Sequence, residues 1–208
     1  QCVAVMSGAK RGEVVVDFCA GAGGKTWGVA AMMNNTGRVY AMDVSENRLA
    51  NIKPRIARAG VGNITPQRLD HERDLRLKKL WNKADRVLVD APCSGLGTLR
   101  RNPDLKYRQS NASIDELVTL QARILDSAAH LVKRGGYLVY ATCSVLAEEN
   151  QNQIQNFLAN HAEFSLVNCS DLLKSNKIEL DTGEFLQLNP ATHHTDGFFA
   201  AVLQKSSS

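Results

Sequence analysis

Short apolar runs alternate with amphipathic stretches along the whole chain. Five runs are rich in β-branched and aromatic residues and bounded by turn formers, which predicts strands at residues 13–19, 38–43, 84–90, 136–142 and 196–205. Runs that are apolar on both faces are typical of a parallel sheet covered by helices on both sides. The pattern therefore predicts an α/β fold on a mostly parallel sheet.

One long helix is marked clearly between the third and fourth predicted strands. Apolar residues recur there at steps of three and four, at Leu117, Leu120, Ile124, Ala128 and Leu131. Ser113 and Glu116 have the spacing of a capping box, which predicts the start of the helix. Gly135 and Gly136 predict its end.

Two other segments have helical spacing. Leu49, Ile52 and Ile56 are helically spaced, but Pro54 lies among them and would cost about 3 kcal/mol inside a helix. We therefore expect a kink or a late helix start at this point. Residues 148–161 predict a further helix.

The length and composition of the chain indicate one domain. With 208 residues, 44% of them hydrophobic, the chain can bury one core, so residues 1–208 are expected to form a single domain. The chain begins with Gln1 rather than Met, which suggests part of a longer protein. Residues 168–195 are polar and predict loops or a short hairpin.

Cysteine usage and hydropathy exclude several classes of protein. The five cysteines are odd in number and never form C-x-x-C, which argues against a disulfide framework and a zinc knuckle. This cysteine usage indicates a reducing compartment. No run of about 18 apolar residues and no charged-then-apolar leader is present, so a cytoplasmic protein is expected rather than a membrane or secreted one. The net charge of +4 is too small to indicate a nucleic-acid partner by itself.

A glycine-rich turn, CAGAGGKT, follows the first predicted strand. A P-loop would need a glycine where Cys19 stands, and a dinucleotide fingerprint would need one at Thr26. A nucleoside cofactor without a pyrophosphate, such as S-adenosylmethionine, remains compatible with this turn. Asp43 ends the second strand, where a carboxylate can accept hydrogen bonds from ribose hydroxyls, although it could instead cap a helix near Ser45.

Two cysteines follow predicted strands in similar contexts, Cys93 in DAPCSGLG and Cys143 in YATCSVLAEEN. Methylation of cytosine carbon 5 requires a thiolate to add to carbon 6 first, and the adduct must later be undone. Two thiols at adjacent strand ends meet both requirements, and Asp90 could bond the base edge. Chemistry alone does not say which thiol attacks. For Cys2, Cys19 and Cys169 a purely structural role is preferred.

With these motifs, the chain resembles the RNA cytosine-5 methyltransferases, typified by the bacterial Sun (Fmu) ribosomal RNA enzyme. The resemblance rests on Asp70 and on DFCAGAGGKT (17–26), AMDVSENRL (41–49), DAPCSGLGTLRRNPDLKYR (90–108), YATCSVLAEEN (140–150) and DGFFAAVL (196–203). It implies a Rossmann-like class I S-adenosylmethionine-dependent methyltransferase fold with a mostly parallel seven-stranded sheet. It also implies that Cys143 is the nucleophile and that Cys93 assists release.

The same resemblance implies a cofactor site, and the residues of one loop suggest an RNA site. The cofactor residues would be Cys19, Ala20, Gly21, Ala22, Gly23, Gly24, Lys25, Asp43 at the ribose, Arg48, Asp70 at the adenine amino group and Asp90 between cofactor and base. Ala22 stands where the family usually has proline, which would weaken cofactor binding slightly. A charged loop such as 99–108 is usually only solvated, but this one combines phosphate attraction with a stacking surface beside the two cysteine loops. We therefore expect it to contact RNA through Arg100, Arg101, Lys106, Tyr107 and Arg108.

The sequence therefore predicts an S-adenosylmethionine-dependent RNA cytosine-5 methyltransferase, with ribosomal RNA favoured over transfer RNA on resemblance alone. A catalytically silent RNA-binding assembly factor would keep the cofactor cleft but lose a thiol. A DNA cytosine methyltransferase would attack with Cys93 and would not need Cys143. No metal is expected, because His193 and His194 lack a carboxylate or cysteine at ligand spacing.

Overall fold

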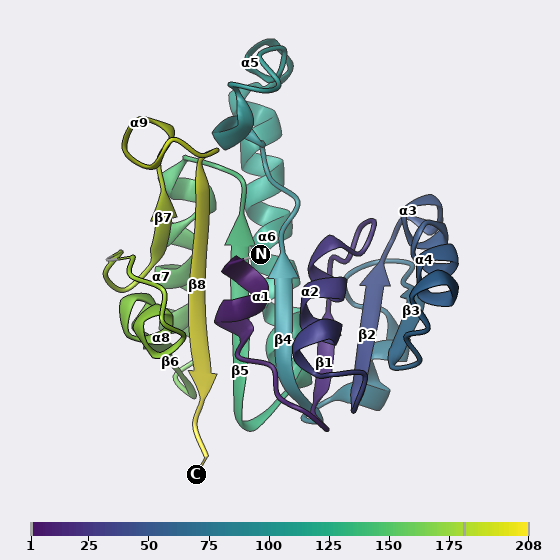
Figure 1. Ribbon diagram of the computed structural model, residues 1–208. Coiled ribbons are helices and arrows are strands. Elements are labelled where there is room, and N and C mark those ends of the chain that lie inside the picture. The colour runs from purple at the N-terminus through teal and green to yellow at the C-terminus, as the bar shows by residue number, and fades with distance from the viewer. Residues whose placement is uncertain (1, 181, 208) are drawn as a thin grey trace.

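A twisted, mostly parallel sheet runs through the centre of the computed structural model, which describes residues 2–180 and 182–207 (Figure 1). The strands are β1 (Val14–Asp17), β2 (Arg38–Asp43), β3 (Ile64–Arg68), β4 (Ala84–Asp90), β5 (Val132–Thr142), β6 (Phe164–Val167), β7 (Leu186–Leu188) and β8 (Phe198–Lys205). Their order is β3-β2-β1-β4-β5-β8-β6, and β7 pairs with β8 beside this path. The first five strands pair in parallel, whereas β8 is antiparallel to β5, β6 and β7.

The prediction of seven strands was wrong, because the described residues form an eight-stranded sheet. The extra strand is β7, which has three residues and lies in the polar segment predicted as loops or a short hairpin. Its antiparallel pairing with β8 gives that segment more structure than its composition indicated. Three residues are too few for a period-two pattern to be recognised.

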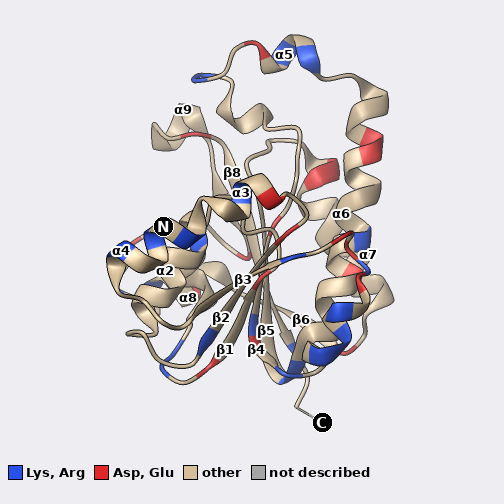
Figure 2. Ribbon diagram, turned by 90° about the vertical axis from the view of Figure 1, so that its right-hand side faces the viewer, with Lys and Arg blue, Asp and Glu red and all other residues tan. Residues whose placement is uncertain are grey.

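Helices cover both faces of the sheet, as predicted. They are α1 (Cys2–Ser7), α2 (Gly24–Met32), α3 (Glu46–Ala50), α4 (Ile52–Ala59), α5 (Leu105–Arg108), α6 (Asn111–Leu131), α7 (Gln151–Asn160), α8 (Cys169–Ser175), α9 (Pro190–His193) and the 3-10 turns η1 (Leu75–Leu80), η2 (Leu96–Thr98) and η3 (Ala147–Glu149). With the sheet seen edge-on, α1, α2 and α8 lie on one side and α6 and α7 on the other (Figure 2). Each face has its own buried apolar cluster.

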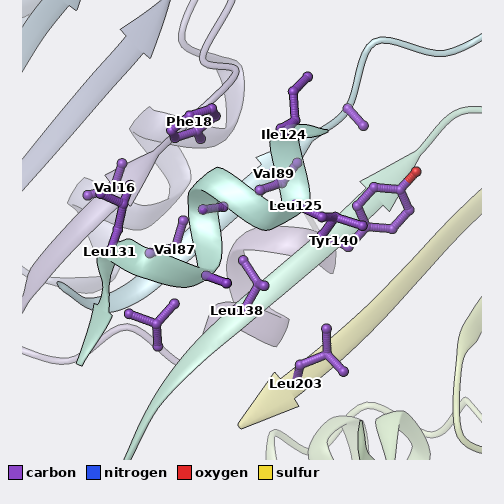
Figure 3. Packing of buried hydrophobic residues seen from close by; sticks show 14 of the residues in the cluster. Val16, Phe18, Val87, Val89, Ile124, Leu125, Leu131, Leu138, Tyr140 and Leu203 are labelled. Carbon is purple, nitrogen blue, oxygen red and sulfur yellow. The ribbon is translucent and has the colours of Figure 1, made fainter. Parts of the chain in front are cut away.

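The long helix α6 packs on β4 and β5 through its predicted apolar face (Figure 3). Leu125 and Leu131 are fully buried there against Val87 and Leu138. Replacing such a leucine by alanine typically costs about 2–5 kcal/mol of stability, because the cavity left behind closes only in part. This packing fixes the position of the two strands whose ends carry the cysteines.

The predicted ends of α6 were wrong at both termini. The helix begins one turn early, with Ser110 as N-cap and Ser113 completing the capping box in place of a glutamate. It ends at Leu131, before Gly135 and Gly136, because Val132 is already extended and pairs with Ala84. Gly135, at φ +73°, provides a turn inside the extended segment.

Of the two other helical predictions, the one near Pro54 is confirmed and the one at 148–161 is wrong at its start. The interruption expected near Pro54 is confirmed, since α3 ends at Ala50 and α4 begins at Ile52, which puts the proline in the first turn of a new helix. The helix expected at 148–161 begins later, at Gln151, because Ala147–Glu149 forms a separate 3-10 turn.

The sheet order reverses between β1 and β4. The chain proceeds from β1 to β2 on one side and from β4 to β5 on the other. In open α/β sheets, ligands bind in the crevice outside the carboxyl ends of the strands at such a reversal. Asp17 and Asp90 are the last residues of the two strands that flank it.

Candidate active site

A cavity of about 980 Å³ opens at the carboxyl ends of β1, β2, β4 and β5. Its walls include Asp17, Asp43, Asp90, Cys93 and Cys143. These side chains are as many as 126 positions apart in the sequence and meet only because their strands are neighbours in one sheet. The cavity therefore lies where the sheet order predicts a ligand.

The glycine-rich turn forms one wall of the cavity. Gly21 and Gly23 have φ values of +54° and +85°, which residues with a side chain rarely adopt. A Cβ atom added at Gly21 or Gly24 would meet no other atom within 4 Å, so it would extend into open space. The turn leads directly into α2, which begins at Gly24.

Asp43 holds this turn in place from the end of β2. One carboxylate oxygen accepts a 2.8 Å hydrogen bond from the Gly21 N–H, and the other accepts a 2.8 Å bond from the Ser45 N–H. Asp43 does not cap the helix near Ser45 itself. Ser45 is the N-cap of α3, and Asp43 holds the backbone of that cap. A carboxylate has about four acceptor positions, so Asp43 can accept further bonds from a ligand.

Asp17 is a site residue that the sequence reasoning did not assign. It is 1% exposed at the end of β1, and one of its oxygens accepts a 2.6 Å hydrogen bond from Thr26 Oγ1. Its Oδ1 atom has no hydrogen-bond partner in the described part of the chain. Burial raises the pKa of Asp17 to about 6, although the Thr26 hydrogen bond opposes the shift. Its position at the end of the first strand was the signal available in the sequence.

Cys93 and Cys143 lie side by side, as their placement after adjacent strands predicted. Their Sγ atoms are 3.3 Å apart, within hydrogen-bonding distance for thiols. The hydrogen bond from Cys93 lowers the pKa of Cys143, whereas burial opposes this. The same bond, together with burial, raises the pKa of Cys93. The first thiolate of the pair therefore forms on Cys143, and the reactive form of a thiol is the thiolate.

The other described thiols differ from this pair. Burial raises the pKa of Cys19 well above its ordinary value and that of Cys169 to about 11. Cys169 is fully buried. Both thiols are therefore protonated at neutral pH. Cys19 nevertheless lines the cavity, so a contact between Cys19 and the cofactor stays a prediction.

Lys25 and Asp90 form an ion pair across the cavity wall. Lys25 lies in the first turn of α2, and Asp90 ends β4 three residues before Cys93. Their side chains are 28% and 33% exposed, so the pair is accessible from the cavity. This ion pair joins the glycine turn to the cysteine loop and fixes the carboxylate beside the thiols.

A family model described as 16S rRNA methyltransferase RsmB/F matches residues 4–204. The chain belongs to this family. It is 40% identical over 197 residues to the probable ribosomal RNA small subunit methyltransferase B of Synechocystis, covering 93% of this chain and 43% of that protein. It is 34% identical to the ribosomal RNA small subunit methyltransferase F of Serratia proteamaculans, covering 99% of this chain and 43% of the relative. The chain thus spans less than half the length of these relatives.

Solved structures agree with the family and the fold. The crystal structure of NSun6 from Pyrococcus horikoshii with SFG superposes with a TM-score of 0.85 at 30% identity, covering 100% of this chain and 51% of that one. The methyltransferase homolog protein from Pyrococcus horikoshii gives a TM-score of 0.77 at 30% identity, covering 97% and 66%. The fold of this RsmB/F family chain is the Rossmann-like methyltransferase fold.

The loop predicted to contact RNA stands beyond the strand ends, where α5 marks its tip (Figure 1). Tyr107 is 86% exposed, and the four basic residues predicted with it are also exposed. Two of those residues form ion pairs, Arg101 with Asp196 and Arg108 with Asp104. Arg100 and Lys106 have no ion pair in the described residues and are available to a phosphate.

Asp70 does not itself line the cavity in this RsmB/F family chain. Its side chain is 65% exposed and accepts a 2.8 Å hydrogen bond from Arg76. Leu69 and Glu72 contribute to the cavity wall on either side of it. A role for Asp70 at the adenine ring therefore stays a prediction. Arg48, by contrast, lines the cavity.

Two further observations concern metal ions and membranes. Among residues 2–180 and 182–207, no three His, Cys, Asp or Glu side chains are grouped so that they could hold a metal ion. His193 instead accepts a 3.0 Å hydrogen bond from the Asn189 N–H in a short helical turn. No helix in the described part of the chain is long and apolar enough to span a bilayer.

Proposed function

We propose that this chain transfers a methyl group from S-adenosylmethionine to carbon 5 of a cytosine in RNA, with ribosomal RNA as the substrate. The observation that carries the proposal is the pair of thiols 3.3 Å apart on the wall of a cavity that also contains the glycine turn. The names of the relatives in the RsmB/F family support the ribosomal substrate. A reducing cytoplasm fits the proposal, because both thiols must remain reduced.

The residues present fit S-adenosylmethionine. The open space above Gly21 and Gly24 suits a ligand that lies against the backbone, and the unpartnered Oδ1 of buried Asp17 suits a cationic amino group. Asp43 suits the ribose hydroxyls, since it lines the cavity and one of its oxygens is bonded to the glycine turn. When bound, the cofactor supplies an electrophilic methyl group on a sulfonium sulfur.

The chain's own residues would prepare the cytosine. Cys143, the more acidic thiol, adds to carbon 6, forming a carbon–sulfur bond and making carbon 5 nucleophilic. Asp90, held by Lys25, accepts a hydrogen bond from the exocyclic amino group and orients the ring. After methylation, solvent water acts as the base and takes up the carbon 5 proton, the double bond to carbon 6 re-forms, and the carbon–sulfur bond breaks, so that Cys143 leaves as a thiolate. The Cys93 thiol assists this release by donating a hydrogen bond to that thiolate, across the 3.3 Å that separates the two sulfurs.

The exposed loop around Tyr107 would hold the RNA. Phosphates would bind Arg100 and Lys106, and an unstacked base would lie on the tyrosine ring. The target base must leave any helix, because carbon 5 and carbon 6 are not reachable within the stack. Gln109 ties this loop to the cysteine loop through a 2.9 Å hydrogen bond to the Ser94 carbonyl.

Methyl transfer to RNA tests the proposal directly. We expect the chain with S-adenosylmethionine to form 5-methylcytidine in 16S ribosomal RNA transcripts, measured by mass spectrometry of digested nucleosides and mapped by bisulfite sequencing. Transfer to duplex DNA but not RNA would favour a DNA methyltransferase. Binding of RNA without any transfer, in the presence of bound cofactor, would favour the silent assembly factor.

A further inference from the structure

A buried glutamate lies beneath the two cysteine loops. Glu149, in η3, is fully buried, and its carboxylate accepts three hydrogen bonds in the described structure. The Ser94 N–H donates at 2.8 Å, the Ser94 hydroxyl at 2.6 Å and the Gln121 side-chain amide at 3.1 Å. Within the described residues, no Lys or Arg pairs with it, so these donors alone compensate for its burial.

Ser94 connects this carboxylate to both cysteines. It directly follows Cys93, and its hydroxyl lies 3.3 Å from the hydroxyl of Ser144, which directly follows Cys143. Both serines are 1% exposed. The two Cys-Ser pairs are thus arranged alike, with the thiols lining the cavity and the hydroxyls facing each other, and the Ser94 hydroxyl links this pair to Glu149.

The residue after Glu149 holds the other loop. The Asn150 side-chain amide donates a 3.0 Å hydrogen bond to the Ser144 carbonyl and accepts a 2.5 Å bond from the Thr142 hydroxyl. The two loops also touch directly, because the Gly97 N–H donates a 2.9 Å bond to the Cys143 carbonyl. Glu149 and Asn150 therefore fasten the two cysteine loops from one short segment.

Helix α6 braces the same network from the opposite side. The Gln121 amide bonds both Glu149 and the Pro92 carbonyl, the latter at 2.9 Å, just before Cys93. Gln153 in turn donates to the Gln121 carbonyl oxygen at 3.3 Å. The Ser94 hydroxyl and the Gln121 side chain, two of the three donors to the carboxylate, are thus each held by a further partner.

We propose that Glu149 is a positioning residue that sets the distance and orientation of the Cys93 and Cys143 thiols. Stability alone does not require a carboxylate here, since well-packed apolar groups often stabilise a core as well as buried charges do. A carboxylate does provide two strong acceptor oxygens, and each of them accepts a hydrogen bond from Ser94, the residue that follows Cys93. The consequence for catalysis rests on the proposed function, but the geometry of the thiols does not.

A dithiol probe tests the geometry without RNA or cofactor. Phenylarsine oxide forms two arsenic–sulfur bonds with two adjacent thiols and releases one water, whereas a single thiol holds it weakly. We expect the full chain to bind one equivalent and Cys93→Ser to lose that binding. Glu149→Gln should bind the arsenical about ten-fold more weakly, as expected for a displacement of a fraction of an ångström. Glu148→Gln, a neighbouring exposed glutamate, is the matched control and should bind like the unsubstituted chain.

Methyl transfer provides the second measurement. For Glu149→Gln we expect kcat to fall about ten-fold while KM for the cofactor changes less than about two-fold, the signature of a lost arrangement at the reacting groups. A folded Glu149→Gln chain with unchanged arsenical binding and unchanged kcat would overturn the proposal. If only the arsenical result appears and no variant, including the unsubstituted chain, methylates RNA, the positioning role stands and the proposed function fails.

A smaller change covers the case in which Glu149→Gln does not fold. Ser144→Ala removes one hydroxyl of the network and leaves the carboxylate with all three of its donors. We expect arsenical binding about three-fold weaker and a matching loss of kcat. Unchanged values in a folded Ser144→Ala chain, together with an unfolded Glu149→Gln chain, would assign the network to stability instead.

Discussion

The Oδ2 atom of Asp43 accepts a 2.8 Å hydrogen bond from the backbone N–H of Gly21, so the end of β2 holds the glycine turn that follows β1. The other carboxylate oxygen is bonded in the same way to Ser45. A single side chain therefore shapes two loops of the cavity wall and still has acceptor positions for a ligand.

Asp43→Ala should weaken the binding of S-adenosylmethionine by about 1–3 kcal/mol, because charge-assisted hydrogen bonds are lost and the turn loses its anchor. Isothermal titration calorimetry measures this directly. Asp115→Ala, which removes an exposed aspartate of α6 outside the cavity wall, is the control and should bind normally. Equal affinities of the two variants would contradict a cofactor role for Asp43.

Asp17 should make the stability of the unliganded chain depend on pH. Its pKa is about 6 in the folded chain against an ordinary value of 3.8, so the folded state binds the proton more tightly than the unfolded state. The contribution of this group to stability is therefore complete at low pH and is lost as the pH rises through about 6. The loss is of the order of 2–3 kcal/mol, at about 1.4 kcal/mol for each pH unit.

Asp17→Asn should remove this dependence. Urea denaturation should find the variant more stable than the unsubstituted chain at pH 8 by about 1–3 kcal/mol, with the difference shrinking toward pH 4. The same variant should bind S-adenosylmethionine more weakly, since a neutral amide cannot replace a carboxylate beside a cationic amino group. A variant that is less stable at pH 8 than at pH 4, relative to the unsubstituted chain, would refute this account.

The two thiols should give opposite phenotypes when replaced. Cys143→Ser should abolish methyl transfer, because no thiolate remains to add to carbon 6. Cys93→Ser should allow addition but slow release, so a covalent protein–RNA complex should accumulate on a denaturing gel. Turnover in Cys143→Ser together with its loss in Cys93→Ser would reverse the assignment of the roles.

Tyr107 should contribute to RNA binding and not to cofactor binding. Its side chain is 86% exposed at the tip of the loop beyond the strand ends, so Tyr107→Ala should leave the fold intact. Loss of a stacked base costs about 1–3 kcal/mol, to be measured by filter binding with single-stranded RNA. Trp81→Ala removes another exposed aromatic residue, which lies just before the start of β4, at the opposite end of that strand from the cavity, and this variant should bind RNA normally. Similar losses in both variants would show that the loop has no special role.

Local sequence patterns predicted two strands to the residue. β2 and β4 match their predicted ranges at both ends, because each has an apolar centre, Val39–Met42 or Val87–Val89, with charged residues beside it. The start of α6 was missed because Ser113 fills a capping position where the usual pattern has glutamate or glutamine. The late start of α7 has a tertiary cause, since Glu149 lies in a 3-10 turn and bonds Ser94 rather than continuing a helix.

The sequence by itself determined which chemical groups stand at the strand ends: the carboxylates of Asp43 and Asp90, the glycine turn and the two thiols. Only the tertiary structure decided their distances, including the 3.3 Å between Cys93 and Cys143, the burial of Glu149 beneath them and the exposure of Asp70 beside Arg76. Periodicity and turn chemistry act over a few residues, so they can be recognised in the chain alone. The order in which strands pair is set by contacts between distant segments, and that order decides which strand ends become neighbours.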